Sequence, residues 1–217
     1  MRARKLVPIS GDGSLSTPND EKQTVFIVDD DPAIRHAMTL LMGSVGLKSK
    51  AFATANDFLE HFDHPSAGCL VLDIRMPGLS GLELQQRLLD LGVTIPIIFI
   101  TGHADVPMAV QAMQKGAFAF IQKPFRDQDL LENISEAFIS GSRERRKRET
   151  HSAMEARLQT LTRREREVMD LVVAGKPNKV IAYELGVSQR TVEVHRARVM
   201  EKMQARALAD LVRMSLL

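Results

Sequence analysis

The sequence predicts two domains: an α/β domain built on a five-stranded parallel sheet, and a smaller all-α domain. Within residues 23–138, short apolar runs alternate with helical segments, as they do when crossover helices join parallel strands. Within residues 157–217, helical segments follow one another with no strand pattern between them. Charge divides in the same way, because residues 23–125 carry 7 Lys/Arg and 10 Asp/Glu whereas residues 155–217 carry 12 and 8. The two halves are therefore expected to have different partners, nucleic acid for the basic one.

Composition is ordinary for a globular chain of 217 residues, with 44% hydrophobic and 26% charged residues. The single cysteine, Cys69, lies inside an apolar run, and the sequence shows no disulfide or zinc-site pattern. No apolar stretch approaches the roughly 20 residues of a membrane span, and the basic N-terminus lacks the apolar core of an export signal. A cytoplasmic protein without a membrane partner is expected. Residues 1–22, rich in Gly, Ser, Asp, Pro and Asn, are predicted to form a disordered tail.

The first domain is expected to be an α/β flavodoxin-like (βα)5 fold. Apolar runs predict strands at 24–28, 48–52, 69–72, 95–100 and 118–121. Helical patterns predict helices at about 32–45, 55–62, 81–91 and 105–115, and another from about 126. Pro32 opens the first helix and Gly46 closes it. Right-handed crossovers would place the carboxyl ends of all five strands at one edge of the sheet.

The last helix of this domain is predicted to continue into a helical linker, residues 139–156. The basic run from Arg143 to Arg148 is interpreted as a solvated helix surface rather than a phosphate contact. Thr162 and Glu165 form a capping-box pattern at the start of the next helix, which would place Val168, Leu171 and Val172 on one face.

Three further helices are predicted after Gly175. They are Asn178–Leu185, a long helix capped by Ser188 and running to about Met203, and Ala207–Leu216. The turn at Gly186-Val187 separates the first two. A short helix, a glycine-containing turn and a longer helix are typical of the helix-turn-helix arrangement.

Polar residues stand where four of the predicted strands end. Asp29 and Asp30 follow the first strand, Asp73 the third, Thr101 the fourth and Lys123 the fifth. Ligands bind at this edge of open α/β sheets. An aspartyl phosphate needs a carboxylate nucleophile, a divalent cation, a hydroxyl and a fixed positive charge. Thr101 is the expected hydroxyl and Lys123 the expected fixed charge.

Asp73 is the predicted phosphorylated residue. Asp29, Asp30 and Asp73 are the expected carboxylate ligands of Mg²⁺, a hard cation that prefers oxygen. The backbone carbonyl of Arg75 is a further candidate ligand, whereas its side chain is not.

Residues 23–138 resemble the receiver domain of bacterial two-component response regulators. The resemblance is carried, in order and spacing, by the Asp29-Asp30 pair, the turn Asp73-Ile74-Arg75-Met76-Pro77-Gly78, Thr101 and Lys123-Pro124. It implies that a cognate sensor histidine kinase donates the phosphoryl group to Asp73. It also implies a cis bond before Pro124, and X–Pro bonds are where cis peptides occur.

The same resemblance implies a switch and a dimer. In the family, the residues at Thr101 and Phe120 move together on phosphorylation, and a helix–strand face near residues 105–125 is remodelled into a dimer surface. Arg75 and His103 each follow a site residue by two positions, and we hypothesise that they tune hydrolysis of the phosphoryl group by crowding water.

The expected dimer face comprises Val106, Met108 and Phe120. Val106 and Met108 are predicted to be exposed, whereas Ala109, Ala112 and Met113 are predicted to be ordinary core residues.

Residues 157–217 resemble the LuxR-type helix-turn-helix domain. The matching stretches are Leu161–Val168, Asn178–Ala182 and Val187–His195. Together with the stretch Thr101–Met108, this pairing narrows the resemblance to FixJ-like regulators. The expected second domain is therefore an all-α four-helix LuxR-type helix-turn-helix domain.

Helical spacing separates the residues of the long helix that begins after Ser188. Packing inward is expected for Val192, His195, Val199 and Met203, with His195 a satisfied core histidine. Facing the major groove is expected for Arg190, Glu193, Val194 and Ala197. The candidate phosphate contacts are Lys179, Gln189, Arg196, Arg198 and Lys202. Aromatic residues make up only 5% of the chain, which argues against single-strand binding by stacking.

These features predict a transcription regulator and no enzyme. Phosphorylation at Asp73 is expected to convert a monomer, whose receiver restrains the DNA-binding domain, into a homodimer that binds half-sites on a double-stranded DNA operator. Activation through RNA polymerase is the expected output.

Three alternatives are weighed against this interpretation. A haloacid-dehalogenase-type phosphatase would need a second aspartate where Arg75 stands. A flavin-binding module would need a phosphate-cradling loop where Asp29-Asp30-Asp31 stand. A regulator controlled by protein contacts without phosphorylation would keep its response in an Asp73→Asn variant.

Overall fold

The computed structural model describes residues 23–62, 68–102 and 106–215. The chain divides into two compact units, Met1–Ser142 and Arg143–Leu217. The tail predicted for residues 1–22 and the residue His103 lie outside the described residues. Within the described ranges, no helix is both long and apolar enough to cross a membrane.

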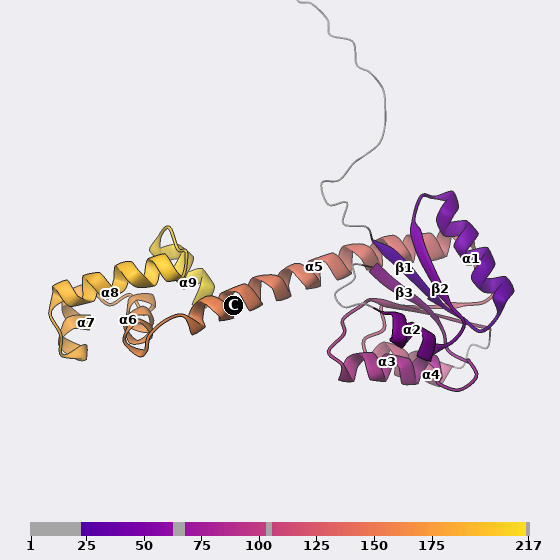
Figure 1. Ribbon diagram of the computed structural model, residues 1–217, viewed down its shortest axis with the longest axis horizontal. Coiled ribbons are helices and arrows are strands. Elements are labelled where there is room, and N and C mark those ends of the chain that lie inside the picture. Colours follow the sequence, from indigo (N-terminus) through magenta and orange to yellow (C-terminus); the bar gives the residue numbers. More distant parts are fainter. Residues whose placement is uncertain (1–22, 63–67, 103–105, 216–217) are drawn as a thin grey trace, which may run out of the picture. The chain divides into compact units, whose positions relative to one another are not determined.

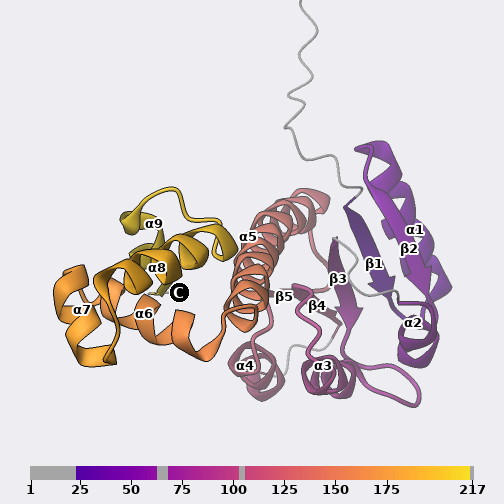
Figure 2. The ribbon, with the colours of Figure 1, turned by 60° about the vertical axis from the view of Figure 1, so that its left-hand side comes forward.

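The first unit (Figure 1) is built on a five-stranded parallel sheet in the order β2-β1-β3-β4-β5, which can be followed in Figure 2. Its strands are β1 (Thr24–Val28), β2 (Lys48–Phe52), β3 (Gly68–Asp73), β4 (Ile97–Thr101) and β5 (Ala119–Gln122). The helices that alternate with them are α1 (Pro32–Ser44), α2 (Ala55–His61), α3 (Gly81–Asp90), α4 (Val106–Gln114) and α5 (Asp127–Gln159). This is the α/β flavodoxin-like arrangement that the alternating pattern predicts.

Helices cover both faces of the sheet (Figure 2). Successive strand residues alternate between two apolar cores, as the period of a strand requires. Ile27 and Val71 pack with α1 and α5, whereas Phe26 and Leu72 pack with α2, α3 and α4. Cys69 is buried in β3, where burial raises the pKa of its thiol to about 12, so it behaves as a small core residue.

Several element boundaries differ by one or two residues from the sequence prediction. Strand β4 begins at Ile97 rather than at Ile95, because Pro96 has no N–H to donate to a strand ladder. Strand β5 begins and ends one residue later than predicted. The start of α1 is as predicted, since the Asp31 carboxylate accepts a hydrogen bond from a first-turn N–H.

The second unit contains the last part of α5 and the helices α6 (Arg163–Val173), α7 (Asn178–Leu185), α8 (Gln189–Lys202) and α9 (Leu208–Ser215). The Thr162–Glu165 capping box is present at the start of α6. Gly186 ends α7 in the left-handed region at φ 64°, and Ser188 caps α8. These two residues make the turn that orients α8 against α6 and α7, and Val192 lies in the resulting core.

Candidate functional site

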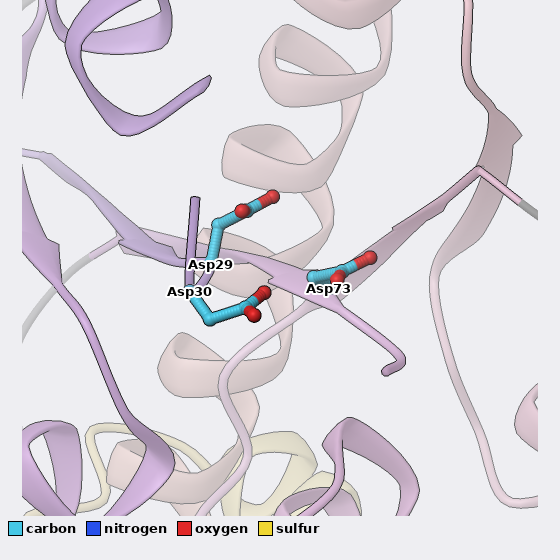
Figure 3. A group of neighbouring side chains, drawn as sticks. All are labelled: Asp29, Asp30 and Asp73. Carbon is cyan, nitrogen blue, oxygen red and sulfur yellow. The ribbon is translucent and has the colours of Figure 1, made fainter. Parts of the chain in front are cut away.

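Three carboxylates converge at the carboxyl end of the sheet (Figure 3). Asp29 and Asp30 follow β1 and Asp73 ends β3, and one ligand oxygen from each lies within 4.8 Å of the others. Strands β1 and β3 are neighbours with Val28 opposite Leu72, so their ends coincide. Asp29 and Asp73 are buried, whereas Asp30 is exposed. Hard oxygen donors that are open to solvent on one side fit Mg²⁺, which keeps several waters when bound.

Lys123 lies against both buried carboxylates. Its ammonium donates to Asp29 Oδ2 at 2.7 Å and stands 3.6 Å from Asp73 Oδ1. The bond between Lys123 and Pro124 is cis, as the sequence resemblance implies. Burial raises the pKa of Asp73; the charges of Asp29 and Asp30 add to this effect, and Lys123 opposes it. The pocket therefore favours a further cation.

Asp29 is held by hydrogen bonds to its side chain and to its backbone. Its Oδ1 accepts from the backbone N–H of Asp31 at 2.9 Å, and its own N–H donates to the Phe52 carbonyl at 3.3 Å. Its backbone carbonyl accepts from Nη1 of Arg35 at 2.7 Å. The sequence prediction missed Arg35. The sequence feature that could have identified Arg35 is a basic side chain near the start of a helix, where the helix dipole disfavours positive charge.

The remaining predicted residues of this pocket lie along the same edge of the sheet. Thr101 ends β4 and is buried, and its carbonyl accepts from the Lys123 N–H at 2.8 Å. Asp73 pairs with Ile100, the residue before Thr101, so the two strand ends are level. Arg75 is exposed in the turn after β3. Phe120 is half-buried in β5 and packs against the core shared with α2, α3 and α4.

For helix α4, the structure confirms the predicted exposure or burial of some side chains and contradicts it for others. Val106 is 71% exposed and Ala112 is fully buried, as predicted. The predictions for Met108 and Met113 are wrong, because Met108 packs against the core and Met113 is 46% exposed. Met108 and Ala112 are four residues apart and share the inner face of the helix. Val106, Val110 and Met113 lie on the outer face at helical spacing.

Helix α8 presents a polar face to solvent. Its exposed residues include Gln189, Arg190, Glu193, Val194, Ala197 and Arg198, and Lys179 is exposed on α7. Val192, Val199 and Met203 are buried as predicted. His195 departs from the prediction, because it is half-buried and its Nδ1 has no hydrogen-bond partner within the described residues.

Lys202 is a predicted phosphate contact, and its ammonium is engaged within the domain. Its ammonium donates to Glu165 Oε2 at 2.7 Å and to the Thr160 carbonyl at 3.0 Å. The hydrogen bond from Lys202 holds the pKa of Glu165 at about 2. Lys202 thus ties the end of α8 to the start of α6. Arg196 also donates within the domain, to Asn178 Oδ1 at 3.2 Å.

Comparison with known families matches both parts of this architecture. The model of the response regulator receiver domain matches residues 25–135. The model of the LuxR family of bacterial regulatory proteins matches residues 159–215. The chain belongs to the two-component response regulators that pair a receiver domain with a LuxR-type domain. It is therefore a transcription regulator with a receiver domain and a LuxR-type DNA-binding domain, not an enzyme.

Similar proteins span nearly the whole regulator. It is 48% identical over 193 residues to the transcriptional regulatory protein FixJ of Rhizobium meliloti, covering 89% of this chain and 95% of that protein. It is 47% identical over 199 residues to nodulation protein W of Bradyrhizobium diazoefficiens, covering 92% and 88%. Among solved structures, the response regulator StyR has a TM-score of 0.84 at 45% identity, covering 90% of this chain and 98% of that one.

Proposed function

We propose that a cognate sensor histidine kinase phosphorylates this regulator at Asp73. Phosphorylation then promotes dimerisation and binding to a specific double-stranded DNA operator, and the bound dimer activates transcription through RNA polymerase. The observation that carries the proposal is the convergence of Asp29, Asp30 and Asp73 with the Lys123 ammonium at one edge of the sheet.

The transfer is a simple displacement at phosphorus. A carboxylate oxygen of Asp73 bonds to phosphorus while the P–N bond to the kinase imidazole breaks, and the electron pair stays on the ring nitrogen. Lys123 is close enough to Asp73 to pair with a phosphoryl oxygen, and Thr101 supplies the hydroxyl partner. The proposed Mg²⁺ ligands are Asp29, Asp30, Asp73 and the backbone carbonyl of Arg75. When bound, Mg²⁺ supplies charge neutralisation between phosphoryl oxygens and carboxylates.

The test is uptake of one phosphoryl group by the full-length protein. Acetyl phosphate with Mg²⁺ serves as the donor, and intact-mass spectrometry is the readout. We expect the unchanged protein to gain one phosphoryl mass and Asp73→Asn to gain none. Phosphoryl uptake by Asp73→Asn would contradict the assignment.

We propose that α4 and β5 form the dimer face through Val106, Met108 and Phe120. The exposure of Val106 supports this, whereas Met108 and Phe120 are half-buried and pack against the core of the receiver domain. Light scattering with beryllofluoride as the phosphoryl mimic tests it. The mimic should double the mass of the unchanged protein but not that of Val106→Glu. An unchanged mass in both would count against dimerisation.

The proposed DNA contacts are Lys179, Gln189, Arg190, Glu193, Val194, Arg196, Ala197 and Arg198. Their positions on or beside the solvent face of α8 support this, since the second helix of such a motif enters the major groove. Selection of bound sequences from a random pool distinguishes their roles. Arg190→Ala should relax sequence preference at one position, whereas Arg198→Ala should weaken all sequences alike.

A further inference from the structure

The loop between β1 and α1 is held by Arg35, a cation that the proposed phosphoryl chemistry does not use. Arg35 lies on α1 and donates from Nη1 to the backbone carbonyl of Asp29 at 2.7 Å. That carbonyl belongs to the peptide bond joining Asp29 to Asp30, and a peptide bond is a rigid plane. One guanidinium contact therefore fixes the unit from which both carboxylates project.

The position of Arg35 has an electrostatic cost. It is the fourth residue of α1, near a helix N-terminus whose partial positive charge disfavours a cation. Its side chain is half-buried and turns back toward the preceding loop. On the other side of the loop, the Asp31 N–H donates to Asp29 Oδ1 at 2.9 Å. The loop is thus held both by its own backbone and by a side chain from the next helix.

We propose that Arg35 is a positioning residue that sets the Mg²⁺ affinity of the pocket. This rests on the proposed function, because it takes Asp29, Asp30 and Asp73 as the ligands. Two effects of Arg35 oppose each other. Its charge repels Mg²⁺, whereas its hydrogen bond holds the Asp29–Asp30 peptide in the orientation that brings the carboxylates together. The second effect dominates, because partners that orient metal ligands commonly change metal affinity about 10-fold or more.

The sign of the change in affinity tests this directly. MgCl₂ is titrated into the full-length protein by isothermal calorimetry. Arg35→Met should bind Mg²⁺ about 10-fold more weakly. Arg35→Lys should bind Mg²⁺ with intermediate affinity, because lysine keeps a positively charged donor but not the planar guanidinium. Arg87→Met removes the same charge from the last turn of α3 and should leave the affinity unchanged.

Affinity that is unchanged or tighter in Arg35→Met would overturn the proposal, because charge repulsion would then be the larger effect. Urea unfolding accompanies each titration. If Arg35→Met does not fold, Arg35→Gln is titrated instead, and weaker Mg²⁺ binding is again the expected result. The Asp30→Asn variant distinguishes failure of the Arg35 proposal from failure of the proposed function. If the unchanged protein and Asp30→Asn bind Mg²⁺ equally, or neither binds, the metal site itself is wrong and the role of Arg35 falls with it.

Discussion

Asp73 is placed where its charge is costly to the fold. It is buried at the end of β3, beside the carboxylates of Asp29 and Asp30, and its pKa is raised in consequence. Lys123 offsets only part of this, because its closest contact is to Asp29 at 2.7 Å. The residue that is proposed to receive the phosphoryl group thus sits in a pocket that has been optimised for function rather than for stability.

Removing this charge should stabilise the metal-free protein. Asp73→Asn is expected to raise the free energy of unfolding near neutral pH, on the order of 1 kcal/mol, because an unfavourable buried charge is lost. A raised folded pKa makes the ionised group destabilising above that pKa. The gain should therefore vanish as the pH falls below the ordinary value of 3.8. Urea unfolding in EDTA, near neutral pH and again below pH 3.8, measures this change in the free energy of unfolding. A stabilisation that persists in acid would contradict this account.

Gly81 allows the start of α3 to approach Asp73 closely. A Cβ on Gly81 would clash with the backbone carbonyl oxygen of Asp73, which is rigid backbone that cannot move aside cheaply. Gly81→Ala is expected to cost about 1–3 kcal/mol of unfolding free energy and to slow phosphoryl uptake. Gly43→Ala is the matched control, because nothing lies within 4 Å of its Cβ position on α1. It should be neutral or slightly stabilising in the same urea experiment.

At the scale of helices, one buried ion pair joins two elements of the DNA-binding domain. Glu165 closes the capping box of α6 by accepting from the Thr162 N–H at 2.8 Å. The same Oε2 accepts from Lys202 at the end of α8. The side chain of Glu165 is 2% exposed, so an unpaired charge there would be poorly solvated. Lys202, whose side chain is 33% exposed, therefore contributes to the packing of the domain through its ammonium group.

Lys202→Met should destabilise the second unit by about 3 kcal/mol, because it leaves the buried Glu165 carboxylate unpaired. Glu165→Gln should cost less, since it removes the buried charge. With a folded pKa of about 2, the stabilising effect of Glu165 is complete above its ordinary value of 4.5 and is lost as the pH falls toward 2. Urea unfolding as a function of pH measures both. A Lys202→Met variant with unchanged stability but weaker DNA binding would contradict this structural role and support the predicted phosphate contact.

At the scale of the whole molecule, the two parts of the chain differ in sign of charge. Residues 23–125 have an excess of acidic side chains, and residues 155–217 have an excess of basic ones. Basic residues attract DNA phosphates and release counterions, so affinity depends steeply on salt. The acidic part of the same chain disfavours contact with DNA, which leaves the basic domain to bind it.

Pairing of two copies should be visible in the salt dependence of DNA binding. In the presence of beryllofluoride, the full-length protein is expected to show about twice the slope of log affinity against log salt, because two basic domains neutralise about twice as many phosphates. Fluorescence anisotropy with labelled operator DNA measures the slope, and Val106→Glu is the control that should keep the smaller one. Equal slopes with and without the mimic would argue against a switch in stoichiometry.

Much of this protein follows from the sequence by local rules. Strand-end residues such as Asp29, Asp73 and Lys123 were predicted to meet because parallel strands in a right-handed α/β sheet end at one edge. The starts of two helices were predicted from Thr162 and Ser188, because capping depends on residues only three positions apart. The order of elements and the composition of the acidic pocket are thus properties of the sequence itself.

Tertiary structure alone decided which surfaces and long side chains are engaged. Helical periodicity defines the two faces of α4, but only packing on the sheet shows that Met108 faces inward and Met113 outward. Arg35 and Lys202 have long, flexible side chains whose end points depend on which element lies within reach. Sequence spacing cannot reveal a carbonyl across a loop or a carboxylate on another helix, because those distances exist only once the helices have packed.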